Sequence, residues 1–129
     1  MTTRLDHVQI AIPFGGEKAA RNFFGDALGL RELPKPADLS GNGGCWFALE
    51  TLQLHCGVDP HFRPAKKAHI ALSIDDLAAL RDKLASMGAT ITGADLIEGR
   101  ARFFTEDPFG NRLEFIASAA PPPSGEREI

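Results

Sequence analysis

Hydrophobic and other residues alternate in two short segments of the chain. In residues 6–13 (DHVQIAIP) and 68–76 (AHIALSIDD), an aliphatic residue occupies every second position after an opening histidine. Side chains on a β-strand point alternately to its two faces, so each segment predicts a strand with one aliphatic face. His7, Gln9 and His69 lie on the opposite faces. Those faces are therefore available for a role other than packing against a helix.

The same series of elements is predicted after each of these strands. Residues 17–28 and about 75–87 carry hydrophobic residues at helical spacing, and Gly29 and Gly88 follow them. Glycine is typical of helix C-termini, so both segments are predicted helices. A short strand, a loop and two further strands then follow in each half, at 30–33, 45–49 and 52–58 and again at 89–92, 100–105 and 112–117.

This order of elements is a tandem repeat, which predicts an α+β fold. The repeat places a first βαβββ module at 4–58, a linker at 59–67 and a second module at 68–117. Because one module is too small to bury both faces of a sheet, the two should pack together as a single domain, residues 1–117. The residues after 117 are rich in Ala, Pro and Ser, which predicts a disordered tail over 118–129.

Composition limits the function classes. The chain of 129 residues has a net charge of -3 and no basic run, which gives no support for a nucleic-acid partner. No apolar stretch reaches membrane-spanning length, and the N-terminus lacks the apolar region of a signal peptide. Two cysteines, Cys45 and Cys56, do not form a disulfide framework. We therefore expect a cytoplasmic protein with reduced thiols and a small-molecule substrate or ligand.

Four polar residues occupy equivalent positions in the two modules. The first strands contribute His7 and His69, and the last strands contribute His55 and Glu114. If the modules pack around a pseudo-twofold axis, these groups can converge in a central cleft. Such a set suits a divalent ion (Ni, Co, Zn, Mn or Fe) with positions left for water and substrate. Each residue alone would more often be an ordinary surface or core residue, so the prediction depends on their equivalence in the repeat.

These motifs resemble the vicinal oxygen chelate superfamily, which includes glyoxalase I, extradiol dioxygenases, fosfomycin-resistance thiol transferases and bleomycin-resistance proteins. The resemblance covers residues 4–117. Its most specific parts are Leu-Asp-His at 5–7, Ala-His-Ile-Ala-Leu at 68–72 and Asp-Pro-Phe-Gly-Asn-Arg-Leu-Glu at 107–114. It implies that each module curls into half a barrel and that two half-barrels surround the central cleft, as in the glyoxalase, bleomycin-resistance and dihydroxybiphenyl dioxygenase fold.

The resemblance also implies roles for the candidate residues. The usual metal ligands of the superfamily fall on His7, His69 and Glu114. The place of His55 is a Glu in bacterial glyoxalase I, where it can leave the metal and act as the base. His55 departs from that pattern and could be a fourth ligand or a general base.

Three functions are compatible with this pattern. The first is a metal-dependent glyoxalase-like lyase or isomerase that chelates a small oxygenated substrate, with His55 as the catalytic proton shuttle. The second is a metal-free resistance-type protein that binds an antibiotic or planar metabolite. The third is an extradiol-type dioxygenase. The absence of tyrosine counts against it, because the resemblance implies a Tyr beside the iron.

Further residues are expected in the cleft. Four aromatic residues lie on strands that would line the cleft, where they would support binding of planar ligands, although such residues are more often ordinary core; they are Trp46, Phe47, Phe103 and Phe104. The predicted substrate-contacting residues are Gln9, Trp46, Gln53 and Phe104. The pattern places no Lys or Arg in the cleft, so it gives no argument for a phosphate or carboxylate substrate. We also expect a homodimer, as is common for short two-module chains of this superfamily.

Overall fold

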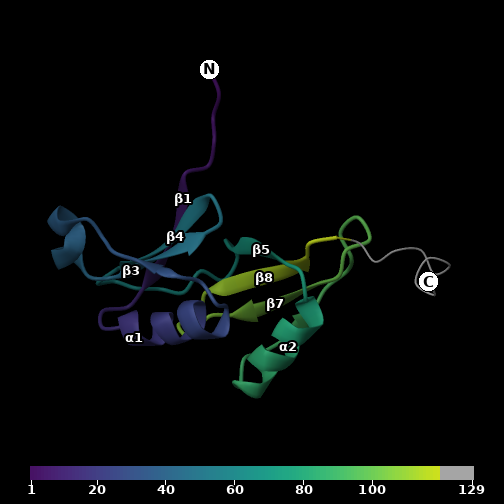
Figure 1. Cartoon of the computed structure of the whole chain (residues 1–129). Helices are drawn as coiled ribbons and strands as arrows, with labels where there is room; N and C mark the ends of the chain where they lie inside the picture. Colours follow the sequence, from purple (N-terminus) through teal and green to yellow (C-terminus); the bar gives the residue numbers. More distant parts are fainter. Residues whose placement is uncertain (120–129) are drawn as a thin grey trace. The chain divides into compact units, whose positions relative to one another are not determined.

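The computed structural model describes residues 1–119, which form two four-stranded mixed β-sheets with short helices (Figure 1). Each sheet belongs to one of two compact units. Unit 1 comprises Met1–Ala65 and Pro108–Asn111, and unit 2 comprises Lys66–Asp107 and the chain from Arg112 onwards. Of the predicted tail at 118–129, all but Ser118 and Ala119 lie outside the described residues. The packing of both modules into a single domain stays a prediction.

Unit 1 contains the first βαβββ module. Its elements are β1 (His7–Ile12), α1 (Glu17–Ala20) continued by a π-helical segment (Arg21–Ala27), β2 (Glu32–Leu33), a 3₁₀ segment (Ala37–Asn42), β3 (Cys45–Leu49) and β4 (Leu52–Val58). The strand order is β1-β4-β3-β2, with β1 parallel to β4 and the other pairs antiparallel. The helix ends before Gly29, whose φ of 76° is a conformation that glycine adopts readily.

Unit 2 repeats this topology. Its elements are β5 (Ile70–Ile74), α2 (Leu77–Ser86), β6 (Thr92–Gly93), β7 (Arg102–Glu106) and β8 (Arg112–Ala117), in the sheet order β5-β8-β7-β6. Asp76 caps α2, because its side chain accepts a hydrogen bond from the backbone N–H of Ala79 at 3.0 Å. The equivalent strands occupy equivalent places in the two sheets, which confirms the α+β class and the two tandem modules.

One face of each sheet supplies the core of its unit. Phe47 on β3 packs against Phe24 of the helix, and Phe103 on β7 packs against Phe115 on β8; all four side chains are buried. Phe47 and Phe103 are therefore core residues, which is the ordinary role that the sequence left open for them. Strand alternation sends their neighbours, Trp46 and Phe104, to the other face instead.

The segment Pro108–Asn111 connects β7 and β8 of the second module in the sequence, but it packs within unit 1. The side chain of Asn111 donates a hydrogen bond to the carbonyl oxygen of Ala11 at 2.8 Å and accepts one from the N–H of Ala65 at 3.0 Å. Phe109 lies edge-on to Phe62 at 6.3 Å between ring centroids. Four residues from the second half of the sequence thus complete the first unit.

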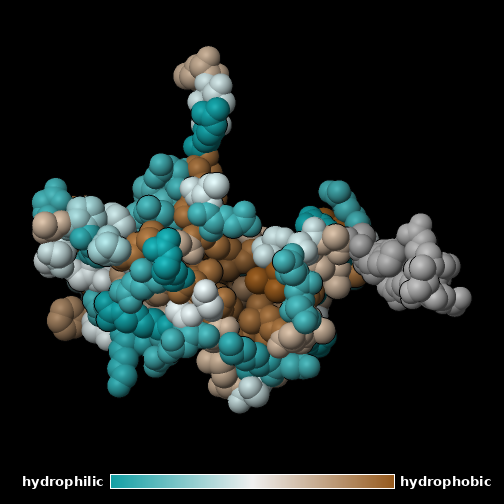
Figure 2. Space-filling view, in the orientation of Figure 1, coloured by the Kyte–Doolittle hydropathy of each residue, from teal (hydrophilic) through white to brown (hydrophobic). Residues whose placement is uncertain are grey.

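Figure 2 shows hydrophilic residues over most of the visible face, with hydrophobic residues visible around β7 and β8. Among residues 1–119, no helix combines the length and apolar character that crossing a membrane requires.

Candidate functional site

The four predicted ligands lie as two pairs, one in each unit. His7 and His55 come from the neighbouring parallel strands β1 and β4, and their rings stack. His69 precedes β5, and Glu114 lies on the neighbouring parallel strand β8. Within residues 1–119, no group of three or more His, Cys, Asp or Glu side chains is gathered so as to hold a metal ion. Convergence of the two pairs on one ion stays a prediction.

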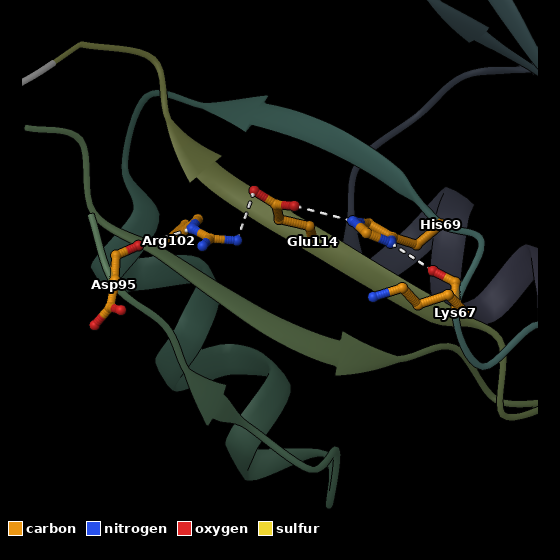
Figure 3. Close-up of polar contacts among 5 residues, drawn as sticks. All are labelled: Lys67, His69, Asp95, Arg102 and Glu114. Carbon is orange, nitrogen blue, oxygen red and sulfur yellow. Dashed lines mark hydrogen bonds and ion pairs between the residues drawn. The ribbon is translucent and has the colours of Figure 1, made fainter. Parts of the chain in front are cut away.

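The pair in unit 2 belongs to a chain of polar contacts across the open face of the sheet, which is the face opposite the buried Phe103 and Phe115 (Figure 3). The Nε2 atom of His69 lies 3.0 Å from Oε1 of Glu114, whose side chain is only 8% exposed. The other carboxylate oxygen of Glu114 lies 3.5 Å from the guanidinium of Arg102. Arg102 also donates to the backbone carbonyl of Asp95 at 2.8 Å. Glu114 is thus a buried carboxylate held between two basic side chains.

The separation of these two atoms is that of an ordinary hydrogen bond, and it is also compatible with two ligands of one divalent ion. Two ligands at right angles around an ion, with bonds of about 2.1 Å, are about 3.0 Å apart. This is the separation of the His69 nitrogen and the Glu114 oxygen. Nδ1 of His69 donates to the backbone carbonyl of Lys67 at 2.9 Å, which directs Nε2 towards Glu114. The two atoms are therefore close enough to become neighbouring ligands of one ion, provided that the proton between them is lost and the side chains turn towards the ion.

In unit 1, His55 lies between two other rings. Its ring is parallel to that of Trp46, with 3.8 Å between centroids, and stacks on His7 at 4.3 Å with planes 21° apart. Because an amide oxygen only accepts, the 2.8 Å contact with Oε1 of Gln53 places the proton of His55 on Nε2 and a lone pair on Nδ1. Burial, with a further contribution from the nearby His7, lowers the pKa of His55. The neutral form of His55 is thereby favoured.

The stacking also bears on metal ligation. The lone pairs of an imidazole lie in its ring plane, and the planes of His7 and His55 meet far beyond the about 2.1 Å of a metal–nitrogen bond. In these rotamers the two rings do not both face one ion. His7 has its Nδ1 occupied by Asp6 at 2.8 Å, which leaves Nε2 as its available nitrogen.

The predicted substrate-contacting residues lie beside these pairs. Gln9 and Trp46 line a cavity of about 280 Å³ in unit 1, and Gln53 forms a hydrogen bond with His55. Phe104 lines a cavity of about 260 Å³ in unit 2 and meets His69 edge-on at 5.3 Å.

Three basic residues beside these groups were missed in the sequence. Lys35 lines the cavity of unit 1, Arg112 lines the cavity of unit 2, and Arg102 contacts Glu114. Strand alternation could have found the two arginines. Arg102 is two residues from Phe104, and Arg112 is two residues from Glu114, so each shares a face with a predicted site residue.

Comparisons with known proteins identify relatives of the whole fold. A family model described as the Glyoxalase/Bleomycin resistance protein/Dioxygenase superfamily matches residues 4–115. A putative glyoxalase family protein from Bacillus anthracis is 38% identical, with a TM-score of 0.85, over 92% of this chain and 98% of that one. A search of curated proteins found no match.

Two more distant solved structures share the fold. A glyoxalase/dioxygenase from Nostoc punctiforme has 23% identity and a TM-score of 0.69 over 86% of this chain and 89% of that one. The E126Q mutant of the fosfomycin resistance protein FosX from Listeria monocytogenes, solved with Mn(II) and 1S,2S-dihydroxypropylphosphonic acid, has 14% identity. Its TM-score is 0.76 over 92% of this chain and 95% of that one.

Proposed function

The chain belongs to the glyoxalase/bleomycin resistance protein/dioxygenase superfamily, and on this premise we propose that it is a metal-dependent glyoxalase-like enzyme, a lyase or isomerase acting on a small oxygenated substrate. The observation that carries the proposal is the 3.0 Å approach of His69 Nε2 to Glu114 Oε1, with both side chains oriented by further contacts. A nitrogen and a carboxylate oxygen at this spacing make two adjacent ligand positions for one divalent ion.

His7 is the proposed third ligand, because the repeat makes it the equivalent of His69. Either the same chain or the second copy in the expected homodimer supplies this histidine. Sedimentation analysis can detect such a dimer. The FosX structure solved with Mn(II), which shares this fold, supports the proposal, and Ni, Co, Zn, Mn and Fe all suit the donor set. When bound, the ion would polarise substrate oxygens and stabilise negative charge that develops on them.

His55 is the proposed proton-transfer group. In this proposal it transfers a proton and does not bind the metal ion. Its lowered pKa keeps the imidazole neutral near pH 7, and Nδ1 carries the available lone pair. The rings of Trp46 and His7 hold the orientation of the imidazole from both sides. A neutral, oriented imidazole is suited to take a proton from a carbon or hydroxyl group and to return it.

Isothermal titration of tag-free, chelator-treated protein with Mn(II), Ni(II), Zn(II), Co(II) and Fe(II) tests the proposal. We expect at least one ion to bind with micromolar or tighter affinity and His69→Ala to abolish that binding. Glu106→Gln is the matched control, because Glu106 is an exposed carboxylate on the same unit whose partner is Lys66. Absence of binding by all five ions, or unchanged binding by His69→Ala, would contradict the proposal.

The role of His55 requires a separate test. His55→Gln should remove turnover while it leaves metal affinity within a few-fold of the unmodified protein. An equal loss of turnover and affinity would make His55 a ligand.

A metal-free binding protein is the second candidate, favoured by the stack of Trp46 on His55 beside the cavity of unit 1. Planar ligands bind well to such aromatic surfaces. Thermal-shift screening separates the cases, because stabilisation by planar organic ligands without any effect of metals or chelators would favour this function. Oxygen uptake that depends on catechol and iron would instead indicate a dioxygenase.

A further inference from the structure

A second feature of unit 2 lies beside Glu114. The cavity of about 260 Å³ is lined by residues that include Lys66, Thr90, Thr92, Phe104 and Arg112. Phe104 is the register partner of Glu114 between β7 and β8, and Thr92 is the partner of Phe104 between β6 and β7. Partners in a sheet point to the same face, so the cavity opens on the face that carries Glu114.

The charges around this cavity are unequal. Its single lining carboxylate, Glu106, forms an ion pair with Lys66 at 3.0 Å. The guanidinium of Arg112 lies 3.9 Å from the centroid of the Phe104 ring, and none of the ion pairs within residues 1–119 includes Arg112. With Lys66 and Arg112 against the one carboxylate of Glu106, the lining carries an excess of positive charge, and Arg112 forms no ion pair with Glu106, its register partner between β7 and β8.

The position of Arg112 suits recognition of an oxyanion. Stacking on Phe104 holds the plane of the guanidinium and leaves its N–H edges as donors. A planar guanidinium binds carboxylate or phosphate oxygens through paired hydrogen bonds. Arg102, the other arginine on this face, differs because its guanidinium already bonds Glu114 and the carbonyl of Asp95 (Figure 3).

The remaining lining residues fit the same ligand class. Thr90 and Thr92 are exposed and offer hydroxyl groups that can donate to an oxyanion or bond a substrate hydroxyl. The volume is slightly below the roughly 300–1,000 Å³ of pockets for drug-sized ligands, which favours a small metabolite.

We infer that the Arg112 cavity binds an oxyanionic substituent, a carboxylate or phosphate, of a small substrate whose reacting part lies at Glu114. The inference rests on the proposed function for the reacting part, whereas the anion site rests on Arg112 and its surroundings alone. It narrows the substrate class to small oxygenated acids or phosphate esters.

The experiment uses the full chain in the presence of a metal chelator, so the result does not depend on metal binding. Amide chemical shifts are followed by NMR during titration with inorganic phosphate and, separately, with acetate at constant ionic strength. Shifts at Thr90, Thr92 and Arg112 are expected for at least one anion. The anion that binds more tightly in the two titrations shows whether the site prefers a phosphate or a carboxylate.

Two variants with the same change in charge make the result specific. Arg112→Met keeps an apolar side chain over Phe104 and should weaken anion affinity about tenfold or more, since a charge-assisted paired contact is lost. Arg81→Gln, an exposed arginine on α2, should bind as the unmodified protein does. Arg112→Lys keeps the positive charge but loses the paired N–H donors of the guanidinium. Its anion affinity should lie between those of the other two variants.

Three results would overturn the inference. These are no shifts with either anion at tens of millimolar, shifts confined to other parts of the chain, or equal affinity of Arg112→Met and Arg81→Gln. Metal binding measured separately would then still support or refute the proposed function.

Discussion

The substitution Glu114→Gln tests whether Glu114 is a buried, paired carboxylate or an ordinary surface acid. The carboxylate accepts from His69 at 3.0 Å and lies 3.5 Å from Arg102, and the side chains of these partners are 26% and 19% exposed. The amide keeps the shape but removes the charge, so it exchanges a charge-assisted bond of about 1.5–3 kcal/mol for a neutral one of about 0.5–1.5 kcal/mol. We expect the free energy of unfolding to fall by about 1–2 kcal/mol. Each kcal/mol corresponds to a fall in Tm of roughly 4 °C for a chain of this size.

The assay is urea denaturation with a metal chelator at pH 7, and Glu106→Gln is the control. The Lys66–Glu106 pair has side chains that are 64% and 46% exposed, so its loss should cost no more than about 0.5 kcal/mol. Equal destabilisation by the two substitutions would refute the reasoning, because Glu114 would then not be held in a buried polar network.

Three further predictions concern unit 1. Because burial lowers the pKa of His55, the unfolded chain binds the proton more readily, and unfolding free energy should fall as pH drops below about 6.5. Urea denaturation at pH 7.5 and 5.5 should show a smaller pH dependence for His55→Gln, and an unchanged dependence would refute the cause. Gly44→Ala should cost about 2–4 kcal/mol, since φ is 80° and the new Cβ would overlap the carbonyl oxygen of Cys56. Thermal denaturation should show a far smaller effect for Gly41→Ala, which meets nothing within 4 Å, and similar losses would contradict this account. Asn111→Ala should cost about 2–4 kcal/mol because two backbone groups lose their partner, and a loss below 0.5 kcal/mol in urea (roughly what a surface change costs) would show those bonds to be unimportant.

The repeat made most of the fold predictable. Alternation of aliphatic residues and the glycines after each helix identified both modules, because these signals are local to a strand or a helix end. Element ends were less predictable: the strand expected at 89–92 is Thr92–Gly93, and the one at 100–105 is Arg102–Glu106. The ends of strands depend on pairing with distant residues, which local sequence does not record.

The candidate site was predictable in its residue types but not in its contacts. Strand parity placed His55 and Glu114 on the open faces, and the structure agrees with that parity. The stack of His55 with Trp46 and the contact between Arg102 and Glu114 depend on side-chain rotamers across neighbouring strands. The place of Asn111 in unit 1 was not predictable either, since its partners are 100 and 46 residues away in the sequence.

The measurement that tests the central claim most directly is anomalous diffraction from crystals grown with the ion that binds most tightly in titration. The account predicts an anomalous peak about 2.0–2.2 Å from both His69 Nε2 and Glu114 Oε1. It would be contradicted by a direct hydrogen bond between these two atoms with no anomalous peak beside them.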